Sequence, residues 1–132
     1  MINNSITFVI LRLAIGTSMF CHGIVRVVKL PKFSAWMLEK FTNSMLPEAL
    51  VIPFSYVLPI IELVIGVLLL IGLFTRLSLI IGGFTMVALI FGSGMIEDWG
   101  ALPSQMIHTF FFAVLLSYLN YNAYSVDNAL KR

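Results

Sequence analysis

The chain has 132 residues, of which 60% are hydrophobic and only 11% are charged, and its formal net charge is +2. Ordinary soluble domains carry roughly 25% charged residues, so this composition cannot cover a soluble surface, and it is too apolar for a disordered chain. No basic block indicates nucleic-acid binding, and the single cysteine, Cys21, excludes an intrachain disulfide. The composition predicts an integral membrane protein.

Long apolar stretches predict four membrane-spanning helices, because about 20 residues are needed to cross the hydrocarbon of a bilayer. We expect these spans at residues 5–25, 49–74, 77–96 and 104–121 of a single domain that covers residues 1–132. The first span lacks the basic start and the cleavage site of a signal peptide, so it is predicted to be a retained helix. The expected fold class is therefore an all-α, four-transmembrane-helix bundle.

The long connection between the first two spans, residues 26–48, is expected to lie outside the hydrocarbon. Within it, the stretch 32–46 places Phe33, Met37 and Phe41 on one face of a helix. Such a stripe predicts an amphipathic helix in the headgroup interface, where it would lie over the entrance of any site below.

The connection between the second and third spans is a tight turn, Gly-Leu-Phe-Thr-Arg at 72–76, which predicts an antiparallel hairpin. Four spans place both termini on one side of the membrane. Basic residues on the two sides nearly balance under the positive-inside rule, and the location we favour is a bacterial inner membrane with cytoplasmic termini.

Four ionisable residues fall inside the predicted spans, and such residues are the first functional candidates because burying them in hydrocarbon is costly. At 1.5 Å per helical residue, His22, Glu62 and His108 lie in one layer near the face that carries the long connection. Arg12 lies near the opposite face. No group of residues with the spacing of a metal site is present, so no metal is expected.

Two interpretations of these residues stay open. In the functional one, Glu62 and His22 form a catalytic pair, hydrogen bonded directly or through a water, and Glu62, His22, His108 and Arg12 contribute to ligand binding. In the structural one, the same groups only fasten helices together, while Arg12 reaches the surface or pairs with the tail near residues 118–121. A haem b held axially by the two histidines is a weaker alternative.

Two segments resemble the DoxX family of small four-helix membrane proteins. The first joins Leu-Arg-Leu-Ala-Ile-Gly at 11–16 to Phe-Cys-His-Gly at 20–23. The second runs from Ile-Glu-Leu-Val-Ile-Gly at 61–66 to Gly-Leu-Phe-Thr-Arg at 72–76. Both lie in the first 76 residues, and the rest of the chain is similar to the family only in length and apolarity.

The resemblance implies a quinone-linked redox setting, because the relative DoxD is a subunit of a thiosulfate:quinone oxidoreductase. It implies quinone as the cofactor and, besides membrane lipids, a protein partner in a redox or respiratory assembly or a homo-oligomer. Family bundles are also likened to the quinone enzymes that form disulfides, but that chemistry needs cysteine pairs and this chain has only Cys21. The family's usual Lys-Leu after His-Gly is displaced here to Lys29-Leu30.

The sequence therefore favours a small subunit that binds a quinone or a similar amphiphilic ligand and has no redox centre of its own. Two alternatives belong to other classes. One is a purely structural or assembly subunit of a larger membrane complex. The other is a small-molecule transporter, which would need a continuous polar path across the bundle.

Overall fold

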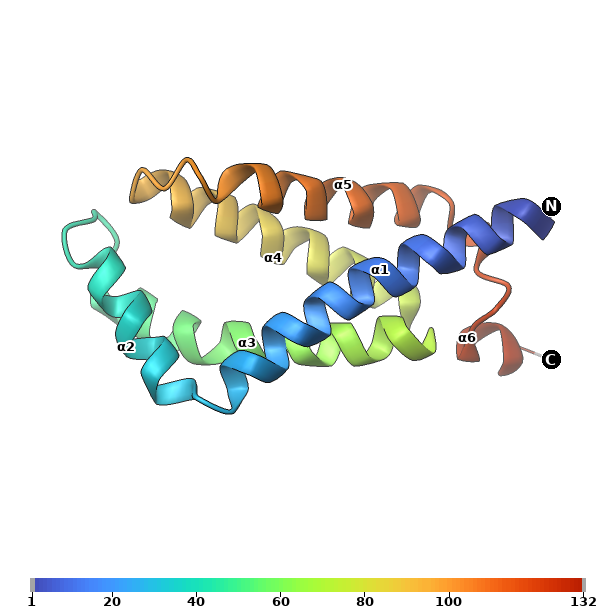
Figure 1. The fold of residues 1–132 in the computed structure, drawn as a ribbon, viewed down its shortest axis with the longest axis horizontal. Coiled ribbons are helices and arrows are strands. Elements are labelled where there is room, and N and C mark those ends of the chain that lie inside the picture. The colour runs from blue at the N-terminus through green and yellow to red at the C-terminus, as the bar shows by residue number, and fades with distance from the viewer. Residues whose placement is uncertain (1, 132) are drawn as a thin grey trace.

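The structure, a computed structural model, describes residues 2–131 and is all-α over that range, with no strand (Figure 1). The elements are, in chain order, α1 (Ile2–Val27), α2 (Leu30–Phe41), α3 (Glu48–Ile71), α4 (Thr75–Met95), α5 (Leu102–Ser117), the short 3₁₀ helix η1 (Leu119–Tyr121) and α6 (Val126–Ala129).

Three helices are long and apolar enough to cross a membrane, namely α1 with 26 residues, α3 with 24 and α4 with 21. Many of their large apolar side chains are exposed, for example Phe84, Phe91 and Ile10, as expected of surfaces that contact lipid. The predicted span 104–121 is shorter in the structure, because α5 has only 16 residues and the chain tightens into η1 after Ser117. That α5 crosses the membrane stays a prediction.

The turn between α3 and α4 lies where the sequence predicts it, although α3 ends at Ile71 rather than at residue 74. Gly72 has a φ of +71°, a left-handed conformation that favours glycine, and its N–H and that of Leu73 both donate to Leu68 O. This arrangement ends a helix by satisfying its last carbonyls. The chain then reverses, and α4 begins at Thr75.

The helices α1 and α3 cross in direct backbone contact. A Cβ atom added to Gly23 would lie 2.3 Å from the backbone nitrogen of Leu63, and one added to Gly66 would lie 2.3 Å from that of Phe20. Two glycines therefore allow a close approach that no other residue permits. The contact places the residues next to Gly23 on α1 beside those next to Leu63 on α3.

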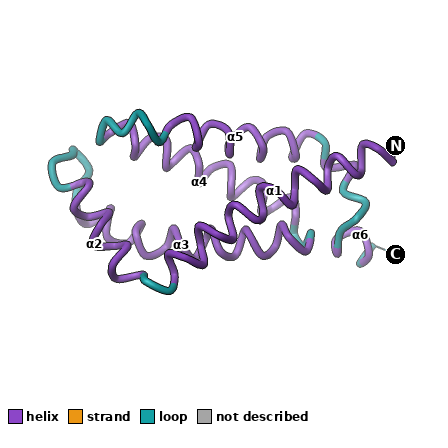
Figure 2. The backbone as a smooth tube through the Cα atoms, viewed as in Figure 1, coloured by secondary structure: helices purple, strands orange, loops and turns teal. Residues whose placement is uncertain are grey.

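The helices α4 and α5 pack against each other and share a core with α1 and α3. Phe112 of α5 packs over Gly82 of α4, and these two helices run side by side (Figure 1). The helices α1, α3, α4 and α5 share one core, which includes Met19, Ile65 and Leu79. The α4–α5 pair then diverges from α1 and α3 toward the end where α2 lies (Figure 2).

The predicted amphipathic helix at 32–46 is shifted and shorter, since α2 spans residues 30–41. Pro31 near its start is pre-organised for a helix, and Ser44 ends it early by bonding back to Phe41 O. The apolar face of α2 packs on α3, where Phe33 and Met37 are buried and Ser34 shares a 2.6 Å hydrogen bond with Ser55. Its position at a membrane interface stays a prediction.

The four-span topology can be tested by labelling introduced cysteines from the two sides of the membrane. We choose the exposed residues Glu39 on α2 and Lys131 near the end of the chain, in a Cys21→Ala background. A membrane-impermeant maleimide applied to one side should modify only one of the two variants. Labelling of both variants from the same side would contradict four spans.

Candidate functional site

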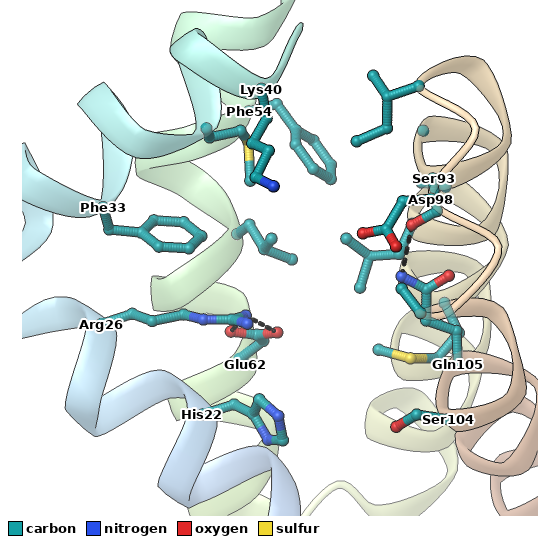
Figure 3. A pocket seen from close by; sticks show the side chains of 18 of the residues that line it. His22, Arg26, Phe33, Lys40, Phe54, Glu62, Ser93, Asp98, Ser104 and Gln105 are labelled. Carbon is teal, nitrogen blue, oxygen red and sulfur yellow. Dashed lines mark hydrogen bonds and ion pairs between the residues drawn. The ribbon is translucent and has the colours of Figure 1, made fainter.

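A cavity of about 270 Å³ opens where the two helix pairs diverge (Figure 3). We call it the central cavity. Residues of α1, α2 and α3 line one wall, and residues of α4, α5 and the loop between them line the other. Its ionisable lining residues are His22, Arg26, Lys40, Glu62, Asp98 and His108.

The partner of Glu62 is Arg26, a residue that the sequence analysis assigned to the connecting segment. Nη1 of Arg26 lies 2.8 Å from both carboxylate oxygens of Glu62. The direct hydrogen bond expected between His22 and Glu62 is therefore replaced by an ion pair, and a water bridge between them stays a prediction. The carboxylate is buried with 2% exposure, and a buried charge requires such a partner.

The three sequence-predicted residues nevertheless line the same cavity. The imidazole rings of His22 and His108 meet edge to face, with their centroids 6.0 Å apart. Nδ1 of His22 lies 2.7 Å from Ser18 O, and Nδ1 of His108 lies 2.7 Å from Ser104 O. Because a carbonyl oxygen can only accept, both Nδ1 atoms carry a hydrogen.

A neutral imidazole has one nitrogen that donates and one that accepts a hydrogen bond. Because Nδ1 donates in both rings, each Nε2 is an acceptor. Nε2 of His108 lies 2.7 Å from Ser18 Oγ, which donates to it. Nε2 of His22 has no hydrogen-bond partner within residues 2–131, and the ring points into the cavity (Figure 3). The wall formed by α1 therefore presents one free basic nitrogen beside the Arg26–Glu62 ion pair.

The opposite wall carries amide and hydroxyl groups. Gln105 donates from Nε2 to Ser93 Oγ at 2.8 Å, while its buried Oε1 has no partner among the described residues. Asp98 lies at this side of the cavity and Lys40 extends from α2 on the other (Figure 3). A ligand in the cavity thus meets donors and acceptors on two sides, with apolar side chains such as Leu58 and Met86 between them.

Arg12 does not line this cavity. It is 3% exposed and donates to Asn122 Oδ1 at 2.6 Å and to Tyr124 O at 2.9 Å. Asn122 in turn donates to Thr75 Oγ1. Arg12 therefore fastens the C-terminal tail to α1 and α4, although its tail partners are residues 122 and 124 rather than 118–121.

We expect Arg12→Gln to act on stability alone. Hydrogen bonds to charged groups contribute about 1.5–3 kcal/mol each, so losing the two should cost about 3 kcal/mol or more. The melting temperature in detergent should fall, and amide hydrogen exchange in residues 122–129 should accelerate. Arg76→Gln, an exposed charge at the start of α4, is the control. Unchanged exchange in the tail of the Arg12 variant would refute this assignment.

Asp127 fastens the same tail by accepting hydrogen bonds from the backbone N–H groups of Phe74 and Thr75, both at 2.8 Å. Burial raises the pKa of the Asp127 carboxyl, but the hydrogen bonds from Thr75 and Phe74 and the charge of Lys131 outweigh it, and the net pKa is below its usual value. The unfolded chain therefore binds this proton more readily. The stabilisation is complete at neutral pH and is lost as the pH falls through the folded-state pKa.

Asp127→Ala should accordingly lower the free energy of unfolding by about 1 kcal/mol at neutral pH, as the loss of a helix cap does. The difference from the parent protein should shrink below about pH 4, where the unfolded carboxyl becomes protonated. Melting temperatures measured across this pH range provide the check. A difference that is independent of pH would show that the carboxylate charge contributes nothing.

These features define a class: a small integral membrane protein whose long apolar helices enclose a polar cavity at one end of the bundle. The DoxX family model matches residues 7–95, more than half of the chain, and the protein belongs to the DoxX family. The match includes His22, Arg26 and Glu62 and ends before α5, which carries His108. Neither a curated protein nor a solved structure is similar enough to the chain to count as a match.

Proposed function

We propose that the central cavity binds the head group of a quinone or a similar amphiphilic ligand, and that the chain is a subunit of a membrane redox assembly. The observation that carries the proposal is the free Nε2 of His22 on the cavity wall, beside the Arg26–Glu62 ion pair. An uncommitted imidazole nitrogen can accept a proton from a ligand hydroxyl near neutral pH.

The residues present fit a ring-shaped head group with oxygen atoms at both ends. One end would meet His22 and Arg26, and the other would meet Lys40 or the polar groups near Gln105. Ligand pockets usually measure about 300–1,000 Å³, so a cavity of about 270 Å³ accommodates the head group alone. An isoprenoid tail would leave through the open end of the cavity, past the aromatic side chains of α2.

The quinol form of the ligand would supply the redox chemistry, with its two electrons passing to a partner protein and its two hydroxyl protons to residues of this chain. The chain's own residues would then bind, orient and exchange protons. His22 Nε2 accepts a hydroxyl proton, and Ser18 orients both imidazole rings through its carbonyl and its hydroxyl group. Arg26 donates from the guanidinium nitrogens that Glu62 does not occupy. Glu62, compensated by Arg26, acts as a second acceptor when that pair opens.

The structural alternative has one observation in its favour, since the Arg26–Glu62 pair joins α1 to α3 as a fastener would. The transport alternative has less support. Between the central cavity and the layer of Arg12, the buried side chains of Ile15, Leu69 and Leu79 form an apolar core, whereas transport requires a continuous polar path.

Native mass spectrometry of the protein extracted in mild detergent tests the proposal. We expect a co-purified quinone, and we expect added decylubiquinone to bind with a ratio of one per chain. His22→Asn should lose most of this binding, whereas Arg76→Gln at the other end of the bundle should retain it. Phospholipid as the only bound species, with no uptake of decylubiquinone, would contradict quinone binding and favour the structural subunit.

A further inference from the structure

A second hollow lies outside the central cavity, at the elbow where α1 passes into α2. It has a volume of about 460 Å³ and is lined by Val25, Arg26, Lys29, Lys32, Phe33 and Trp36. We call it the elbow hollow. Three of its six lining residues are cations and none is acidic, so it differs in charge from the rest of this apolar chain.

The positive charges of the elbow hollow are largely uncompensated. Within residues 2–131, the ammonium groups of Lys29 and Lys32 make no hydrogen bond or ion pair, and both residues are exposed. Arg26 uses only Nη1 for Glu62, so its Nε and Nη2 donors stay available. The two unpaired ammonium groups repel each other, and an anion bound between them and the free donors of Arg26 removes that cost.

The border of the elbow hollow is apolar and aromatic. Trp36 is 51% exposed and stacks on Phe33, with their ring centroids 5.7 Å apart. At the end of α1, Val25 is 52% exposed and Val28 is 77% exposed. A tryptophan with exposed apolar side chains at the end of a spanning-length helix is typical of the level at which lipid head groups meet acyl chains.

We propose that the elbow hollow binds the phosphate head group of an anionic phospholipid. Basic hollows beside membrane helices recognise such head groups through their charge, and guanidinium and ammonium groups form strong hydrogen bonds with phosphate oxygens. Lys29, Lys32 and the free donors of Arg26 contact the phosphate, while the acyl chains lie along Val25 and Val28. The apolar border favours a lipid over a soluble phosphate, which would gain nothing from it.

This site is separate from the quinone proposal and does not depend on it. The two share one side chain, because Arg26 lies between the central cavity and the elbow hollow and lines both. A phosphate at the elbow is therefore placed to compete with Glu62 for the guanidinium of Arg26.

Trp36 supplies a local probe for the test. The chain has two tryptophans, so Trp99→Phe leaves Trp36 as the single fluorophore. The protein is reconstituted in phosphatidylcholine vesicles that contain increasing fractions of dibrominated phosphatidylglycerol or of dibrominated phosphatidylcholine. We expect the anionic lipid to quench Trp36 at a several-fold lower mole fraction than the zwitterionic lipid does.

Matched variants separate a site from general charge attraction. Lys29→Gln with Lys32→Gln should abolish the preference, Lys29→Arg with Lys32→Arg should retain it, and Arg76→Gln with Lys131→Gln removes two charges at the other end and should leave it unchanged. Equal quenching by the two lipids, or a preference that survives the Lys29→Gln and Lys32→Gln changes, would overturn the proposal. If inorganic phosphate, compared with chloride at equal ionic strength, displaces the brominated lipid, the site is one for free phosphate and the lipid assignment fails.

Discussion

Gly23→Ala is expected to separate α1 from α3 and to destabilise the protein strongly, although it adds only one methyl group. The new Cβ would lie 2.3 Å from the backbone nitrogen of Leu63 and 2.5 Å from its Cα. Overpacking usually costs about 1–3 kcal/mol when side chains can shift, but here the obstacle is backbone, so the two helices must move apart. We expect a loss at or above the upper end of that range.

The measurement is the melting temperature in detergent together with size-exclusion chromatography. Gly66→Ala, the reciprocal position whose Cβ would meet the backbone of Phe20, should behave in the same way. Gly94→Ala is the matched control, because nothing lies within 4 Å of a Cβ there and alanine favours a helix by about 1 kcal/mol over glycine. A Gly23 variant that melts like the Gly94 variant would show that the crossing is looser than described.

The same crossing explains how much of the site could be predicted from the sequence. Counting residues along each span placed His22, Glu62 and His108 at one depth, and the structure brings all three to the central cavity. Depth alone does not tell which helices touch. That information comes from the contact of Gly23 with Leu63, which sets α1 against α3 directly beside His22 and Glu62.

Arg26 was missed because the first span was ended at residue 25, where the charged segment begins. In the structure α1 continues to Val27, so Arg26 lies one helical turn after His22 and on the same face. The sequence contains one signal that points to Arg26, namely the acid at position 62, because a buried acid in a membrane span requires a cation nearby. Gln105 and Asp98 on the opposite wall gave no such signal, because their positions depend on how α4 and α5 diverge.

Because Glu62 is paired with Arg26, a substitution of Glu62 cannot distinguish a role in ligand chemistry from a role in holding the helices together. Glu62→Gln removes the charge that compensates Arg26, and breaking a buried pair by removing one partner is destabilising in its own right. A loss of stability and a loss of turnover are then expected under both interpretations. A discriminating variant has to leave every helix contact in place.

His22→Asn comes close to that requirement, because the one contact between helices that it gives up is the edge-to-face contact with His108. It should reduce quinone-linked turnover of the assembly that contains the protein by about 10²- to 10⁴-fold, the usual contribution of general acid–base catalysis. The asparagine amide can still donate to Ser18 O in place of Nδ1, so the melting temperature should stay near that of the parent protein. What the variant lacks is the free Nε2 that accepts a proton.

The His22→Gln variant distinguishes a loss of quinone binding from a loss of proton transfer. Its longer side chain carries an amide group toward the position of Nε2, where it can hydrogen bond to a ligand but cannot take up a proton. We therefore expect the glutamine variant to recover much of the quinone affinity that the asparagine variant loses, while turnover stays low in both. Full turnover in either variant would remove His22 from the chemistry. A fall in melting temperature that parallels the loss of turnover would instead favour the structural role, because an imidazole that only packs against His108 of α5 contributes to stability and to nothing else.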